Sequence, residues 1–122
     1  MNKETNIEDT RETNQLAKRL SEAIVRSDEY IRYRKYLEEL QKDPELYAEV
    51  NNLRKKNFVM QNGGEQRMTY EEYTGIYAES KRLRQNTLVN AFLNAEVGLA
   101  CLIQEINRQI MSKVEFDDEF LS

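Results

Sequence analysis

The chain has 122 residues, a net charge of −4, one cysteine and no histidine. Its length is typical of one domain, but the apolar share of 39% is lean, so the core is either thin or completed by another subunit. The missing histidine excludes Ser–His and Cys–His nucleophile pairs and imidazole metal ligands, and a single cysteine excludes an internal disulfide and a thiolate zinc cage.

The first predicted helix begins near Thr13. A new helix is predicted after Ser27, which has the pattern of an N-cap followed by the acids Asp28 and Glu29. The chain either breaks at Ser27 or runs through it as one helix. The apolar residues of the two segments recur at helical spacing: Leu16, Leu20, Ala23 and Ile24, then Tyr30, Tyr33, Leu37 and Leu40.

The pair Asp43-Pro44 predicts the start of a third helix. Asp is a good N-cap, and Pro is favoured at the first helical position because its missing N–H has no partner there. We expect this helix to stop at Asn62-Gly63-Gly64, with glycine in the left-handed conformation.

Thr69, followed by Glu72, has the spacing of a capping box and opens the fourth predicted helix. Asn86 is predicted to be either a cap or a kink, and the last helix is predicted from about Thr87 to Lys113. At 1.5 Å per residue that helix is about 40 Å long.

These signals predict an all-α fold: an elongated bundle of about five helices with a long C-terminal helix. Residues 1–114 form a single helical domain and 115–122 an acidic tail. The tail is either a solvated, frayed end or a docking peptide, because Phe116, Phe120 and Leu121 lie among its acids. The N-terminus lacks the apolar stretch of a signal peptide, and no apolar run approaches the roughly 20 residues of a spanning helix. We therefore expect a cytoplasmic protein.

The last predicted helix is apolar around much of its circumference, which indicates burial on several sides. We expect a homo-oligomer, most simply a dimer, because such a helix is longer than a compact monomer of this size is wide. The competing interpretation is a monomer whose other helices surround the fifth. The expected interface residues are Leu88, Phe92, Leu99, Leu102, Ile103 and Ile106.

No residue pattern indicates a catalytic, cofactor or metal site. Cys101 is expected to be a buried small hydrophobe rather than a ligand or a redox thiol. Seven tyrosines suit packing and subunit contacts better than stacking on RNA. The basic runs 32–35, 54–56 and 81–84 are read as solvated faces with ion pairs, such as Arg34 with Glu38, rather than as phosphate contacts.

The order of several segments resembles the YlbF/YmcA family of bacterial regulators. An amphipathic N-terminal helix precedes a Tyr-, Leu- and Asp-Pro-Glu-containing block, and a long apolar helix closes the chain. The segments that carry the resemblance are 33–37, 42–46, 53–58, 61–62 and 88–96.

The resemblance implies an all-helical, oligomer-forming, non-catalytic adaptor that acts by protein–protein contact. Family members work with partners of the YmcA and YaaT type in sporulation, competence and biofilm formation. Some complexes carry iron–sulfur clusters on cysteines; with Cys101 alone, we expect no cluster and no other cofactor here. The alternative is an RNA-associated accessory factor that supports messenger-RNA processing by an endoribonuclease, although the neutral body of the chain argues against direct RNA binding. An enzyme that uses carboxylates ranks below both.

Overall fold

The computed structural model describes the backbone of residues 3–63 and 68–121, and the side chains among them from Thr10 onward. Both described stretches are free of strands, which confirms the all-α fold class there. The helices are α1 (Lys3–Val25), α2 (Asp28–Gln41), α3 (Pro44–Asn62), α4 (Tyr70–Leu83) and α5 (Thr87–Met111), with a short 3-10 turn at Glu119–Leu121.

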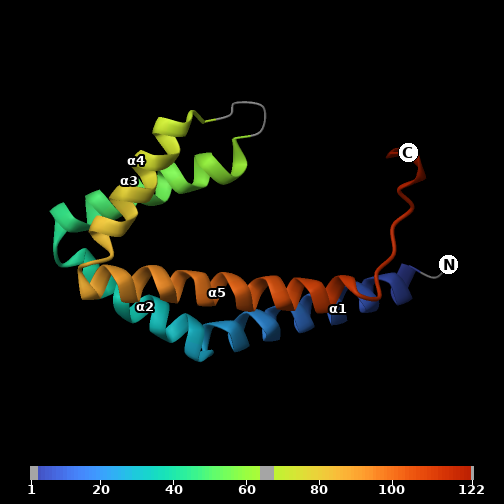
Figure 1. The fold of residues 1–122 in the computed structure, drawn as a ribbon. Coiled ribbons are helices and arrows are strands. Elements are labelled where there is room, and N and C mark those ends of the chain that lie inside the picture. Colours follow the sequence, from blue (N-terminus) through green and yellow to red (C-terminus); the bar gives the residue numbers. More distant parts are fainter. Residues whose placement is uncertain (1–2, 64–67, 122) are drawn as a thin grey trace.

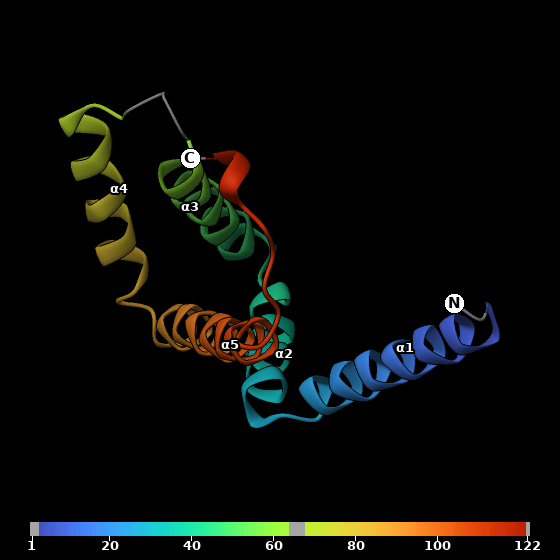
Figure 2. The same cartoon turned by 90° about the vertical axis from the view of Figure 1, so that its right-hand side faces the viewer.

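The helices form an elongated molecule built on α5, as predicted (Figure 1). α2 packs along the first half of α5, and this is the most extensive contact between helices. α3 and α4 pair as a hairpin that rises from the same end of α5 (Figure 1). Seen along α5, α1 leads away from the α2–α5 pair (Figure 2). The C-terminal tail leaves from the far end of α5.

Side-chain caps fix the predicted helix starts. Ser27 breaks the chain between α1 and α2, and its Oγ accepts a hydrogen bond from the Tyr30 amide at 3.2 Å. Asp43 accepts from the Leu46 amide at 3.2 Å, with Pro44 as the first residue of α3. Thr69 and Asn86 cap α4 and α5 in the same way.

Two boundaries differ from the sequence predictions, the start of α1 and the end of α5. α1 begins at Lys3, ten residues before the expected start, where no apolar repeat marks a helix. α3 ends at Asn62, at the predicted Asn62-Gly63-Gly64 stop, and Gly63 itself has φ −72° rather than the left-handed conformation. α5 ends at Met111, because Ser112 turns its hydroxyl back to the Gln109 carbonyl at 2.7 Å. Gly64, and with it most of the expected 62–68 loop, lies outside the described residues.

The core lies at one end of the molecule. Tyr33 of α2 stacks on the ring of Phe92 of α5 at 5.6 Å, which fixes α2 across α5. The core is drawn from α2, α3, α4 and the first half of α5: Leu37, Leu40, Val50, Leu53, Ile76, Leu83, Val89, Phe92 and Leu93. No side chain described in α1 belongs to it.

Candidate interaction surfaces

The second half of α5 has no buried residue: everything after Ala95 is half-buried or exposed. A helix turns about 100° per residue, so five of its apolar residues fall within a band about 100° wide. We call this band the α5 stripe: Leu99, Leu102, Ile103, Ile106 and Ile110. Such a band is as wide as the buried face of an ordinary amphipathic helix.

The expected interface residues divide between the core and this stripe. Phe92 is fully buried in the chain's own core, so it is not available to a second chain in this arrangement. Leu88 is half-buried and packs against the core. Leu99, Leu102, Ile103 and Ile106 lie in the α5 stripe, and their place in an interface stays a prediction.

Cys101 is exposed, so its predicted burial is wrong. It lies two positions after Leu99, which places it about 200° around the helix, on the side away from the α5 stripe. The apolar neighbours in sequence therefore do not surround it in space.

α1 carries a second apolar face, the α1 stripe: Leu16 and Ala23, which are exposed, and Leu20 and Ile24, which are half-buried. Leu16 is 56% exposed, and α2 is the one helix that makes more than marginal contact with α1. The sequence analysis identified this helical repeat but assigned it no role at a surface, because the spacing alone does not say whether another helix covers the face.

The exposed area is large for a chain of this mass. The chain exposes 10252 Å². A compact monomer of 14.5 kDa is expected to expose about 6,900 Å². The chain therefore exposes about half as much surface again as a compact monomer, which agrees with its elongated form.

α5 is also long and apolar enough to cross a membrane by length and composition, which corrects the expectation that no segment approaches this limit. Its richest window has a mean hydropathy of 1.3 and is 22% buried in the chain. The polar residues of α5 make contacts to protein, however. Arg84 bonds to Asn90 and Asn94 at 3.0 Å each, and Glu96 pairs with Arg54.

A tyrosine face covers the outer side of α4. Tyr70, Tyr73 and Tyr77 lie within about 60° of one another around the helix. All three are exposed, Tyr77 by 71%. Beside them lies the α3–α4 groove, about 410 Å³ in volume, whose apolar lining includes Met60 and Ile76 as well as Tyr73 and Tyr77.

The basic runs are partly engaged in ion pairs, as predicted. Arg34 pairs with Glu38 at 3.4 Å, four residues on along the same helix. Lys56 instead links α3 to Glu79 of α4 at 3.0 Å. Thus two of the three runs contain a cation that is held by a carboxylate of this chain.

Arg54 fastens α3 to α5. Its guanidinium bonds to Glu96 at 2.5 Å and to Asn51 at 2.9 Å, and lies over the ring of Phe92, 5.2 Å from the centroid. Partial burial lowers the pKa of Arg54, but the hydrogen bond and charge of Glu96 outweigh that effect and raise the pKa above its ordinary value.

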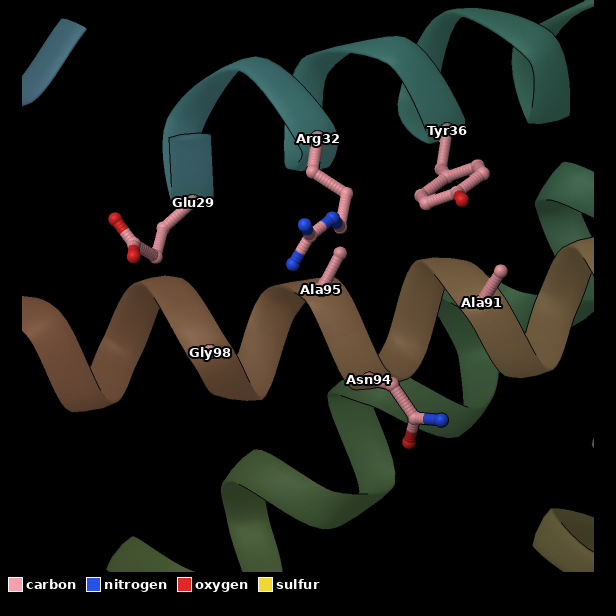
Figure 3. Close-up of a pocket in the computed structure, with 7 residues that line it drawn as sticks. All are labelled: Glu29, Arg32, Tyr36, Ala91, Asn94, Ala95 and Gly98. Carbon is pink, nitrogen blue, oxygen red and sulfur yellow. The ribbon is translucent and has the colours of Figure 1, made fainter. Parts of the chain in front are cut away.

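A hollow of about 250 Å³ lies between α2 and α5. Figure 3 shows Arg32 and Tyr36 of α2 above the small residues Ala91 and Ala95 of α5. Gly98 continues this row of small residues, and a Cβ added there would meet no atom within 4 Å. The hollow is open and shallow because α5 has only small side chains along this side.

The described residues offer no assembled chemical site. No three of their Asp, Glu or Cys side chains gather where they could hold a metal ion. None of their buried side chains is polar or charged, whereas a carboxyl group that serves as a general acid near neutral pH requires burial. The candidate sites are therefore surfaces: the α1 and α5 stripes, and the tyrosine face with its groove.

Comparison with known proteins shows which family the chain resembles. No solved structure matches the chain. A UPF0342 protein from Caldicellulosiruptor bescii is 30% identical over 109 residues, which is 85% of this chain and 89% of the relative. The family model described as "Control of competence regulator ComK, YlbF/YmcA" matches residues 14–115, from the middle of α1 to just beyond α5. This match includes the whole of α2 to α5 and both apolar stripes, and the chain belongs to the YlbF/YmcA family.

Proposed function

We propose that this protein is a non-catalytic regulatory adaptor of the bacterial cytoplasm that acts through protein–protein contacts. Membership of a family described as controlling the competence regulator ComK supports a regulatory role. The observation that carries the proposal is the division of the molecule: one end holds the core, and the other presents uncovered apolar faces. Exposed apolar surface of this extent marks sites of protein contact.

The adaptor works as a homodimer. The α5 stripe is the centre of the contact, and a two-fold arrangement is the commonest one for identical chains. The area in excess of a compact monomer, about 3,000 Å² per chain, is enough for an obligate dimer interface.

The tyrosine face is the surface that meets a different protein. Tyrosine is enriched at protein interfaces, because its ring supplies apolar area and its hydroxyl supplies a hydrogen bond. The α3–α4 groove provides a hollow for an apolar side chain of the partner. The partners that the family implies are regulatory proteins of the YmcA and YaaT type, in sporulation, competence and biofilm formation.

The test is complex formation with the YmcA- and YaaT-type proteins of the same bacterium, followed by co-purification and titration. We expect the wild-type chain to form a complex, and the double variant Tyr73→Ala with Tyr77→Ala to weaken it at least tenfold. Phe116→Ala, which removes an equally exposed ring from the acidic tail, is the matched control and should change little. A chain that binds neither protein contradicts the proposal, and loss through Phe116→Ala alone transfers the contact to the tail.

Direct RNA binding is not part of this proposal. Arg54 and Lys56 are held by carboxylates, and Arg84 is hydrogen-bonded to two asparagines, so these three cations are already engaged within the chain. An RNA gel shift whose affinity falls steeply with salt would favour the RNA-associated accessory function instead.

The adaptor binds no cofactor in this proposal. Cys101 is the chain's one cysteine, and a cluster would need cysteines from other chains. Iron–sulfur absorbance of anaerobically purified protein, lost in Cys101→Ser, would contradict this.

A further inference from the structure

We propose that the two chains of the dimer exchange their N-terminal helices, so that α1 of each copy packs on the α5 stripe of the other. The inference rests on the proposed homodimer and names the segment that covers α5. It is carried by two apolar stripes in the same chain, each partly exposed and each about as wide as the face that one helix packs against another.

The two stripes match in width and character. Leu16, Leu20 and Ala23 recur at the i, i+4, i+7 spacing that packs one helix on another. At 100° per residue, no charged side chain of residues 13–24 points within the α1 stripe, and none of residues 99–110 points within the α5 stripe. The charges of α5 near the stripe, Glu105 and Arg108, lie on its other side and pair with each other at 2.6 Å.

The turn at Ser27 directs α1 away from its own α5. The Ser27 hydroxyl donates to the Ile24 carbonyl at 2.6 Å and accepts from the Tyr30 amide at 3.2 Å, so one side chain holds both helix ends. With this turn in place α1 departs from the α2–α5 pair, as the view along α5 shows (Figure 2). A second copy related by a two-fold axis can receive α1, and it returns its own α1 to the first.

The exchange covers both apolar stripes at once. Each two-fold dimer makes the α1–α5 contact twice, and both contacts cover surface that is already fixed in helical form. A dimer in which only the two α5 helices pack together would leave the α1 stripe of both chains exposed to solvent, with Leu16 still 56% exposed.

Cross-linking between single-cysteine chains tests the exchange. One chain carries Leu20→Cys with Cys101→Ser, and the other carries Ile106→Cys with Cys101→Ser. The two are produced together and treated with a short bismaleimide. We expect a covalent product that joins the two different chains. The wild-type chain is the matched control for the second chain, because its Cys101 lies on α5 but away from the stripe and should not cross-link to α1.

The other cross-linking outcomes overturn the exchange. A product between two Ile106→Cys chains, without the mixed product, indicates that α5 pairs with α5. If a chain carrying both new cysteines links only within itself, α1 folds back on its own α5. The masses of the same samples separate the two proposals: a dimer without the mixed product refutes the exchange alone, and a monomer refutes the dimer as well.

Two substitutions in α1 provide an independent test. Leu16 and Val25 are about equally exposed, 56% and 52%, but lie on opposite sides of α1. We expect Leu16→Glu to raise the dimer dissociation constant at least tenfold and Val25→Glu to change it little, with helix content retained in both. Equal effects would overturn the exchange. A monomeric wild-type chain that sediments with phosphatidylglycerol vesicles would assign the α5 stripe to a lipid surface instead.

Discussion

Cys101 shows how an apolar sequence neighbourhood misleads at the scale of one residue. Leu99, Leu102 and Ile103 surround it in sequence, and burial was the natural expectation. On a helix that is covered on few sides, however, the angular position decides exposure, and Cys101 faces away from the stripe. Apolar neighbours in the sequence predict that a residue is buried only where other helices pack around the whole circumference of its helix.

The exposure of Cys101 predicts a reactive thiol. We expect a maleimide to label the native protein completely, at a rate close to that of the urea-unfolded chain, and to leave Cys101→Ser unlabelled. The site lies outside the proposed dimer contact, so labelling should proceed without dissociation. A thiol that reacts in urea but is protected in the native protein would contradict its placement.

Arg54 joins an ion pair, a side-chain hydrogen bond and a ring contact at one position. We expect Arg54→Ala to lower the free energy of unfolding by about 1–2 kcal/mol, measured by urea denaturation, because it loosens α3 from α5. Arg34→Ala removes the exposed pair with Glu38 and should cost less than about 0.5 kcal/mol. An equal cost for the two variants would show that the Arg54 contacts add nothing specific.

At the scale of helices, the sequence predicted the starts better than the ends. Four helix starts were predictable because each N-cap side chain has an oxygen that accepts a hydrogen bond from a backbone amide without a partner inside the helix. These N-caps are Ser27, Asp43, Thr69 and Asn86. Residues that end helices act through backbone geometry, and Gly63 did not adopt the left-handed form. The polar start of α1 carries no comparable signal.

Asp43 provides the cap whose loss is simplest to measure. Its carboxylate accepts from the Leu46 amide at 3.2 Å at the start of α3, which supplies the fully buried Val50 and Leu53. We expect Asp43→Ala to lower the free energy of unfolding by about 1 kcal/mol and Asp43→Asn to lower it less. If both variants unfold like wild type in urea, the cap does not stabilise the folded state.

At the scale of the molecule, apolar repeats identified the faces but not their partners. The helical spacing of apolar residues predicted both the α1 and the α5 stripe. The sequence does not, however, predict the angle between one helix and the next, and this angle decides which stripe is covered. The Ser27 turn sends α1 away, and α2 covers only the first half of α5. The sequence likewise showed the α4 tyrosines as a cluster. Their exposure, however, depends on the direction in which the α3–α4 hairpin leaves α5, which the sequence does not predict.

The core lies at one end of the molecule, and the helices at the other end expose apolar side chains. The isolated chain therefore leaves apolar surface that a second chain can bury. Burial of apolar surface is worth about 25 cal/mol per Å², so stripes of this length favour association strongly even after its entropic costs. We expect the folded unit to be two chains that share α1 and α5.

The most direct test is the mass of the wild-type protein in solution, measured by light scattering on a sizing column at low micromolar concentration. The chain has a mass of 14.5 kDa, and the dimer predicts twice that value. A mass near 14.5 kDa, unchanged as the concentration rises, would contradict the two-chain unit and leave the α1 and α5 stripes without the partner assigned to them.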